Sequence, residues 1–510
     1  MGFGKLTQTV VAATLLASAV AGAAASGAEP PIPETGGGTP LSSDVQHLHF
    51  KYGPIHVAPG QNLILIGPVT IEKPAYDGYV TRFKPNLVRA DGTVPPVDII
   101  HLHHGVFLNM SRRDATTNDL PGERFFATGE EKTIFRMPPG YGYFVRGSDV
   151  WALNYMVHNQ TPIADDVWIT YDVDYVPASS RLGKRMKAVH PVWMDVENGK
   201  SYPVFDVHHG AGGRKGRWTF PDDASKPYGN GPPKNVWTAP RDGTLIATAG
   251  HLHPGGLWDD MYLERGNGRG RNSVHIFRSK ANYYDPHGPI SWDLSMTGTR
   301  PSWRVPVRKG QRLRVTTTYD TKRASWYESM GIMVAYMADG LKGPDPFRHH
   351  PSAHGTVTHG PLPENSHFGG EDTGAADPRS LPNGQTIDNR VGIEAFEYTP
   401  GGQGLPGVFG QPPTVKAGQS LTFDNQDWGA DVYHTITACR APCNRGTGIS
   451  YPIANGPVDF DSGELGYGVP SFTAAKNTVE WQTPKGLKPG TYTYFCRIHP
   501  YMRGAFRVVR

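Results

Sequence analysis

The chain has very few cysteines, no long apolar segment beyond its N-terminus and no block of like charge. Three Cys occur among 510 residues, and the first of them is Cys439. Past the first 25 residues, no stretch reaches the about 20 apolar residues that a membrane-spanning helix needs, so we expect no membrane span. The formal net charge is +4 without a basic block, so nucleic-acid binding has no support.

Turn-forming residues are abundant instead. The chain contains 62 Gly and 46 Pro, and 11% of its residues are aromatic. Short apolar runs between Gly and Pro turns predict an all-β fold, and the length exceeds one ordinary core. We expect two β-sandwich domains over residues 46–190 and 191–340, a His/Pro/Gly-rich connector over 341–385, and a third β domain over 386–510.

The N-terminus has the pattern of a secretory signal peptide over residues 1–25, followed by a flexible linker over 26–45. A start that contains Lys5 precedes the apolar run Val10–Ala17, and the small residues Ala21–Ala25 offer a cleavage site. No Cys lies near that site, which argues against a lipid anchor. We therefore expect an exported, soluble protein in the periplasm or outside the cell.

The three cysteines divide into a pair and a single residue. Cys439 and Cys443 are close enough in sequence to close a small disulfide loop, and two free thiols are the alternative. An oxidising compartment favours the disulfide. Cys496 is then left over and requires another explanation.

A His-x-His pair follows a predicted buried strand. His251 and His253 come after the run Thr244–Thr248 and before two turn glycines. Side chains two positions apart in a strand point to the same face, so both imidazoles can converge on one metal ion. A second predicted strand, Ser325–Met337, offers thioethers. A ligand set of imidazoles and a thioether suits copper that cycles between Cu(I) and Cu(II). The alternative is that His251 and His253 are ordinary core or surface histidines that bind no metal.

The first predicted sandwich has its own histidines. The segment Val97–Leu108 places His101, His103 and His104 on one apolar strand, and His158 ends another. Imidazoles from separate strands of a rigid sandwich can form an all-nitrogen copper site. His101 shares the strand face of His103, whereas His104 points to the opposite face unless the strand twists or ends there. For His101 we favour a structural, hydrogen-bonded role.

The order of these motifs resembles the copper type II, ascorbate-dependent monooxygenases, the family of peptidylglycine α-hydroxylating monooxygenase and dopamine β-monooxygenase. The resemblance covers residues 46–340 and combines a His-His pair, a Val-His run, a His-x-His with turn glycines and a Glu-Ser-Met strand. It implies two jelly-roll-like β-sandwiches, each with one copper ion, at facing surfaces across an open cleft.

The resemblance also assigns metal ligands. The electron-transfer copper would bind to His103, His104 and His158. The copper that binds and activates O₂ would bind to His251, His253 and Met330. Met330 takes this role rather than Met333 because it follows the family-like Glu-Ser dipeptide.

The chain departs from the family around the predicted O₂ site. Animal members carry several disulfides in this region, and this chain has no Cys there. An Arg before the His-x-His of the peptide-specific enzyme is replaced by Ala249, and an Asn and a Tyr that help to hold a peptide carboxylate are replaced by Ile332 and Val334. Because this clamp is missing, we expect an apolar or aromatic small molecule rather than a peptide that ends in glycine.

The last predicted domain carries a separate ligand set. Cys496, His499 and Met502 form a C-x₂-H-x₂-M motif, and His434 lies upstream of it. Two imidazoles, a thiolate and a weak axial thioether are the ligands of a type 1 blue-copper site for electron transfer. Residues 386–510 resemble a plastocyanin-type cupredoxin, which implies a Greek-key β-barrel or sandwich. A binuclear site would need a second Cys in this loop, and a multicopper oxidase would place histidines beside Cys496; the sequence has neither.

Other histidines receive no metal site. The connector contains His359 and His367 among Pro, Gly and Asn, which is typical of a solvated linker. The pairs His47/His49 and His208/His209 are assigned no site either.

These observations predict an exported copper-dependent monooxygenase that hydroxylates a C–H bond with O₂. We expect two type 2-like coppers and one type 1 copper, an unknown small-molecule substrate, and an external electron donor whose electrons pass through the type 1 site. The alternative is a non-catalytic copper-binding protein for electron transfer. A copper-storage or copper-delivery protein is a third, weaker hypothesis.

Overall fold

The structure is a computed structural model. It describes residues 44–62, 66–161, 163–200, 202–266, 270–285, 288–361, 376–384, 389–402, 410–427, 432–439, 458–466 and 478–510. The predicted signal peptide and nearly all of the predicted linker lie outside these ranges. Within them the chain folds almost entirely into β-strands, as the short apolar runs and turn residues predict. The helical turns described are η1 (Gly183–Arg185), η2 (Gly213–Lys215) and η3 (Gly270–Asn272).

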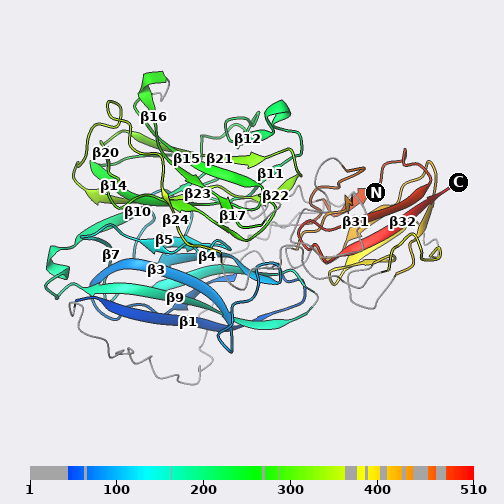
Figure 1. The fold of residues 1–510 in the computed structure, drawn as a ribbon, viewed down its shortest axis with the longest axis horizontal. Coiled ribbons are helices and arrows are strands. Elements are labelled where there is room, and N and C mark those ends of the chain that lie inside the picture. Colours follow the sequence, from blue (N-terminus) through cyan, green and yellow to red (C-terminus); the bar gives the residue numbers. More distant parts are fainter. Residues whose placement is uncertain are drawn as a thin grey trace, which may run out of the picture. The chain divides into compact units, whose positions relative to one another are not determined.

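One long sheet runs through both predicted sandwiches. Its strands β1, β9 and β3 lie side by side (Figure 1). In spatial order the sheet contains β1 (Gln46–Val57), β9 (Asp165–Pro177), β3 (Gly78–Arg89), β7 (Tyr141–Val145), β10 (Lys187–Asp195), β23 (Ile332–Asp339), β14 (Gly243–His251), β19 (Thr297–Gly298) and β24 (Thr356–Val357). Two short strands pair beside this path, namely β6 (Phe135–Arg136) with β3 and β20 (Val305–Val307) with β14. The parallel pairing of β7 with β10 joins the two halves of the sheet.

A second sheet packs over the first half of the long sheet. It contains β2 (Ile66–Ile71), β8 (Trp151–Asn159), β4 (Ile100–Asn109) and β5 (Glu123–Thr128), in that order. Strand β4 is buried along nearly its whole length, including its three histidines. Aromatic rings such as Phe83, Phe107 and Tyr171 fill the space between the sheets, and each buried ring of this size contributes roughly 1.5–3 kcal/mol.

The second half of the long sheet is covered by strands from residues 205–329. One sheet contains β12 (Arg217–Phe220), β21 (Arg312–Asp320), β15 (Gly256–Glu264) and β16 (Ser273–Lys280), with β13 (Val236–Thr238) beside β21. Two-stranded pairs are formed by β11 (Phe205–Val207) with β22 (Trp326–Ser329) and by β17 (Asn282–Tyr283) with β18 (Leu294–Ser295). Their buried side chains, including Met261, Phe277 and Trp326, form a second core.

The C-terminal part of the chain forms two further four-stranded sheets. The first contains β26 (Glu397–Thr399), β25 (Arg390–Glu394), β28 (Thr422–Asn425) and β30 (Glu480–Gln482). The second contains β27 (Thr414–Lys416), β32 (Arg503–Val509), β31 (Gly490–Phe495) and β29 (Thr437–Ala438). Their core includes Phe423, Tyr494 and Phe506, and it is continuous with Trp193, Tyr202 and Met330 of the preceding segments.

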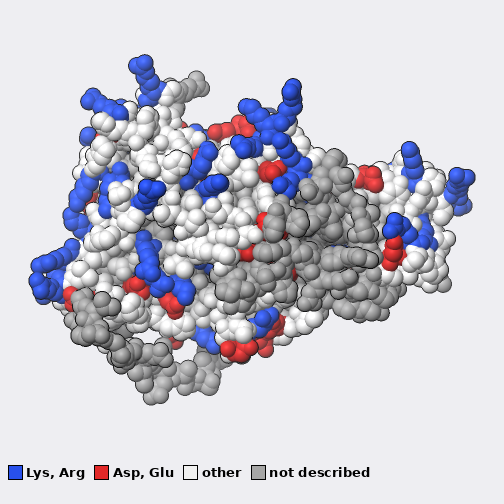
Figure 2. Space-filling model, in the orientation of Figure 1, with Lys and Arg blue, Asp and Glu red and all other residues white. Residues whose placement is uncertain are grey.

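Residues 39–510 form one compact unit, so the domain boundaries expected inside it stay a prediction. None of the helices in the described ranges is long and apolar enough to cross a bilayer. On the face drawn in Figure 2, Lys and Arg side chains stand in separate groups over the described residues rather than in one continuous patch. The all-β fold class predicted from the sequence is confirmed.

Candidate copper centres

Six buried histidines from three strands and one turn lie together, and we call them the histidine cluster. Its members are His101, His103 and His104 on β4, His158 on β8, His251 at the end of β14, and His253 in the turn before β15. They include every histidine that the sequence assigned to the two type 2-like copper sites. His101, for which we favoured a structural role, belongs to the cluster as well.

A β-bulge explains how His104 joins the cluster. His101 lies opposite His158 and His104 lies opposite Met156, and the register shifts between Leu102 and His104. Residues directly opposite each other in a sheet share a face, so His104 lies on the same face as His101 and His158. The extra residue of the bulge is His103. Simple alternation along the strand would have turned His104 to the other face.

The rings are close enough for neighbouring members to touch. Ring centroids are 5.0 Å apart for His101 and His158, 4.5 Å for His103 and His253, and 5.1 Å for His251 and His253. The family resemblance implied two ligand sets at facing surfaces across an open cleft. In the structure the two sets meet directly at His103 and His253.

Hydrogen bonds fix the orientation of three of these imidazoles. Nδ1 of His251 lies 3.0 Å from the Glu131 carboxylate, Nδ1 of His253 donates to the Glu328 carbonyl at 2.5 Å, and Nδ1 of His101 donates to the Val97 carbonyl at 2.8 Å. The Nε2 atoms of the three rings have no hydrogen-bond partner among the described residues. A ligand imidazole is typically held through its other nitrogen in this way, and a buried nitrogen without a partner is costly unless a metal binds it.

Burial favours the uncharged form of four of these imidazoles. It lowers the pKa of His101 and that of His104 to about 3, and it lowers the pKa of His103 and of His253 well below the usual value, with the neighbouring imidazoles adding to the effect. Neutral imidazoles are the form that binds a metal ion. The cluster therefore supplies nitrogen ligands of the kind that copper prefers.

Met330 lies at the edge of the cluster. Its side chain is 3% exposed, and its backbone is held on both sides by the Tyr319 hydroxyl, which donates to the Met330 carbonyl at 2.6 Å and accepts from the Met330 amide at 3.0 Å. Met330, His251 and His104 line the same cavity. The predicted thioether therefore shares a cavity wall with one predicted O₂-site histidine and one histidine of the other set.

That cavity has a volume of about 410 Å³, within the range of small-molecule sites. Its walls combine apolar side chains with a few charged ones. Besides the three residues above, it is lined by Gly67, Pro68, Val106, Leu108, Leu120, Pro121, Arg124, Ala127, Thr128, Asn154, Trp193, Asp195, Lys200, Tyr202, Pro203 and Ile332. A small molecule in this cavity would lie against His104, His251 and Met330.

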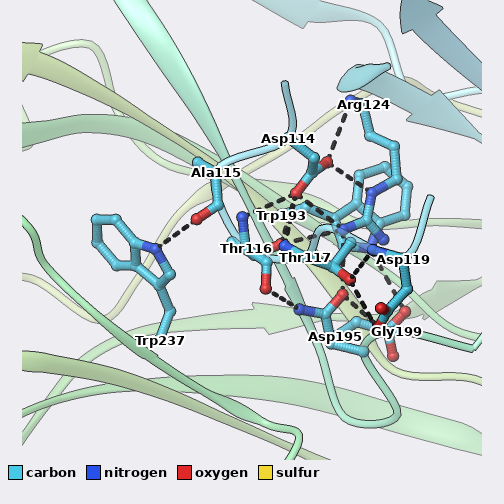
Figure 3. A network of polar contacts seen from close by, with 11 residues as sticks. Asp114, Ala115, Thr116, Thr117, Asp119, Arg124, Trp193, Asp195, Gly199 and Trp237 are labelled. Carbon is cyan, nitrogen blue, oxygen red and sulfur yellow. Dashed lines mark hydrogen bonds and ion pairs between the residues drawn. The ribbon is translucent and has the colours of Figure 1, made fainter. Parts of the chain in front are cut away.

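Two charged side chains of the cavity wall, Arg124 and Asp195, belong to a polar network (Figure 3), and the third, Lys200, lies 3.2 Å from the Glu197 carboxylate. Arg124 donates to both carboxylate oxygens of Asp114, at 2.8 and 3.1 Å, and its guanidinium lies over the Trp193 ring at 4.6 Å. Asp195 accepts from the Glu197 amide at 2.8 Å, and burial raises its pKa to about 6. Arg124 is thus already neutralised, which leaves Asp195 as a buried carboxyl at the cavity wall.

A second ligand set lies in the C-terminal sheets. Sγ of Cys496 is 3.9 Å from Nδ1 of His434 and 3.7 Å from Nδ1 of His499, and the two nitrogens are 3.3 Å apart. Ligand atoms at the distances found around tetrahedral metal ions, about 2.0–2.3 Å, lie about 3.3–3.6 Å from each other. These three residues are fully buried, as is Met502. The spacing fits one bound metal ion.

Hydrogen bonds prepare this set for a metal. Nε2 of His434 lies 2.9 Å from the Asp427 carboxylate, which leaves Nδ1 for the metal. Burial lowers the pKa of His434, but the Asp427 and Cys496 contacts outweigh it, so the pKa is raised overall. Backbone amides of Thr435 and His499 donate to Cys496 Sγ at 3.3 and 3.4 Å, which favours a thiolate.

The two ligand sets touch each other. The rings of His499 and His158 meet edge to face with centroids 5.4 Å apart. Burial lowers the pKa of His158 well below its usual value, His101 adds to this, and a backbone contact with Ile498 opposes it. A predicted type 1 ligand therefore contacts a predicted ligand of the histidine cluster.

Several functional contacts were not predicted from the sequence. These are the carboxylates of Glu130, Glu131 and Asp427 and the carbonyl of Glu328. The two glutamates lie in the turn that follows the buried strand β5, and that position was the available signal. Cys439 is disulfide-bonded, and its predicted partner Cys443 lies outside the described residues.

The histidines that received no site have ordinary partners where they are described. His47 and His49 lie 2.8 and 2.6 Å from Asp174 and Asp172 on the exposed β1–β9 face. His209 hydrogen-bonds to the Lys322 carbonyl. His359 of the connector contacts the Glu131 carbonyl, and His367 lies outside the described residues.

Comparison with known proteins does not assign the chain to a family. No protein-family model and no curated protein matches the chain. Among solved structures, a Cu-containing nitrite reductase (NirK) from Thermus scotoductus SA-01 aligns at 15% identity over 52% of this chain and about half, 55%, of its own, with a TM-score of 0.15. The VP2 subviral particle of infectious bursal disease virus aligns at 12% identity over 60% and 74%, with a TM-score of 0.17. TM-scores this low do not establish a shared fold, so the family resemblance stays a prediction.

Proposed function

We propose that the protein is a copper-dependent oxidoreductase that hydroxylates a C–H bond with O₂ and receives electrons through its own type 1 copper site. The reaction consumes one substrate C–H group, one O₂, two electrons and two protons, and it yields the alcohol and water. The observation that carries the proposal is the contact between His499 and His158, because it joins an electron-transfer ligand set to a buried histidine cluster.

In this proposal His251, His253 and Met330 hold the copper that reacts with O₂, and His103, His104 and His158 hold a second copper that supplies an electron. Copper bound at these positions provides one-electron redox chemistry and O₂ activation. The chain itself orients the ligands. The Glu131 carboxylate fixes His251, and the Glu328 carbonyl fixes His253, so both rings keep Nε2 free for a metal.

The type 1 copper would be held by His434, Cys496, His499 and Met502. Because all four side chains are buried, the surrounding structure limits their movement during electron transfer. Copper held here would accept an electron from an external donor, and the contact of His499 with His158 would link it to the histidine cluster. Joining donor and acceptor in one chain raises their effective concentration.

The substrate would occupy the cavity that His104, His251 and Met330 line. Ile332, which replaces a residue of the peptide carboxylate clamp, is part of its wall. Arg124 is unavailable for a substrate carboxylate because Asp114 occupies it. We therefore propose a small molecule with an apolar body as substrate, in an exported protein.

The test is O₂ consumption by the reduced, copper-loaded protein. We expect consumption in the wild type and loss of most of it in Met330→Leu, with the blue absorption of the type 1 site unchanged. A matched control is Met296→Leu, since Met296 is equally buried but belongs to the core of the second sandwich. Equal consumption by wild type and Met330→Leu would favour the non-catalytic electron-transfer alternative.

A further inference from the structure

A buried glutamate faces the two imidazoles of the proposed O₂ site. The turn Gly129–Lys132 follows β5 and carries Glu130 and Glu131. One carboxylate oxygen of Glu130 and one ring nitrogen each of His251 and His253 all lie within 4.8 Å of one another. Three ligand atoms at this separation can surround a single metal ion.

Glu130 has no other binding partner that would explain its position. Its side chain is 1% exposed, and neither of its carboxylate oxygens has a hydrogen-bond partner within the described ranges. Burying a carboxylate without a partner is strongly unfavourable, and buried charges are usually paired or bound to a metal. A divalent cation between Glu130 and the two histidines would remove this penalty.

The neighbouring residues leave one nitrogen of each imidazole free. Glu131 and the Glu328 carbonyl occupy the Nδ1 atoms of His251 and His253, so their Nε2 atoms are the ones without a partner. The turn also approaches His251 very closely. A Cβ atom on Gly129 would lie 2.5 Å from His251 Cε1, so only glycine allows this approach.

We propose that Glu130 is a ligand of the metal ion held by His251 and His253. This inference rests on the proposed function and changes the site's donor set from two imidazoles and a thioether to two imidazoles, a carboxylate and a nearby thioether. A carboxylate oxygen is a harder donor than a thioether sulfur, so Glu130 favours Cu(II) and Met330 favours Cu(I). The two ligands together hold the ion in both oxidation states.

The test is a Cu(II) titration of the full chain followed by electron paramagnetic resonance. In Glu130→Gln we expect one type 2 signal to be lost or shifted, with its dissociation constant raised about tenfold or more. The other type 2 signal and the blue absorption of the type 1 copper remain, and the blue absorption also reports that the variant is folded. In Met330→Leu we expect an unchanged Cu(II) signal and weaker binding of Cu(I).

The matched control is Glu123→Gln, which alters a buried glutamate of β5, the strand that precedes this turn. Glu123 accepts a hydrogen bond from the Tyr143 hydroxyl at 2.7 Å, and the amide oxygen of Gln can still accept it. We expect this variant to keep all copper signals. If Glu130→Gln does not fold, Glu130→Asp provides the test. Its side chain is one methylene shorter, so the type 2 signal must shift if the carboxylate binds the copper.

The outcomes separate the two proposals. If the wild type binds two type 2 coppers and neither Glu130 variant changes a signal or an affinity, Glu130 is not a ligand, and the proposed function is unaffected. If the wild type binds only the type 1 copper, both the proposed function and the role of Glu130 are wrong.

Discussion

His158 and His499 meet edge to face, with ring centroids 5.4 Å apart and ring planes at 88°. One ring belongs to the histidine cluster, and the other belongs to the ligand set around Cys496. The contact is buried, since His158 is 2% exposed and His499 is fully buried. It is a direct ring contact between the two ligand sets.

Replacing His158 by Phe keeps an aromatic ring at this contact but removes its nitrogens. We expect the blue absorption to persist and the reoxidation of the reduced type 1 copper by O₂ to slow by about tenfold or more, a change of ~1.4 kcal/mol in the barrier. Stopped-flow absorption measures this rate. The control is Phe396→Leu, since Phe396 packs on His499 at 5.1 Å but lies outside the histidine cluster. Equal rates in His158→Phe and wild type would exclude this electron path.

Replacing Cys496 by Ser removes the thiolate of the type 1 site. We expect loss of the blue absorption and loss of most turnover with a protein electron donor, because Ser does not supply the soft sulfur ligand. Turnover with a small chemical reductant that reaches the other coppers directly should persist. Both rates come from O₂ consumption with each reductant. Unchanged turnover with the protein donor would contradict the relay.

Filling the cavity should impair substrate binding without loss of copper. Leu120 lines the cavity and is only partly buried, so Leu120→Trp places a larger ring there at little cost to the fold. We expect kcat/KM to fall about tenfold or more, equivalent to ~1.4 kcal/mol, with unchanged copper spectra. Leu341→Trp, at an exposed position outside the cavity, is the control. A normal kcat/KM in Leu120→Trp would place the substrate elsewhere.

The Asp114–Arg124 pair should make stability depend on pH. Burial raises the pKa of Asp114, but the Arg124 contacts outweigh it, so the pKa is lowered overall. The pair therefore stabilises the fold above the unfolded-state pKa of about 3.9, and this contribution is lost as the pH falls through the lower, folded-state pKa. Because both side chains are buried, Asp114→Asn should cost about 3–5 kcal/mol at pH 7.

Urea unfolding of wild type and Asp114→Asn at a series of pH values checks this expectation. The difference between them should shrink as the pH falls below about 4. Asp345→Asn is the control, because the Asp345–Arg265 pair is exposed and should contribute less than about 1 kcal/mol. A difference that does not change with pH would mean that the Asp114 charge contributes nothing.

The sequence was sufficient for the fold class, and it singled out the histidines that the structure brings together. Short apolar runs, Gly and Pro turns and the clustered His, Cys and Met residues are local features, and they require no knowledge of pairing. The position of His104 was not predictable in the same way. It depends on a bulge at His103, and a bulge is decided by the pairing of β4 with β8.

The contacts between distant segments could not be predicted from the sequence either. Glu130 gives no periodic signal, because its relevance comes from a turn that approaches His251 only in the folded chain. The contact of His103 with His253 joins two halves of the chain, and these halves share a sheet through the pairing of β7 with β10. Nothing in the spacing of the histidines indicated that continuity.

The most direct test of the central claim is copper per chain in the copper-loaded protein, with visible absorption and electron paramagnetic resonance on the same sample. We predict one blue copper and two type 2 coppers. A single copper that is entirely blue would mean that the histidine cluster binds none, and it would contradict the monooxygenase proposal.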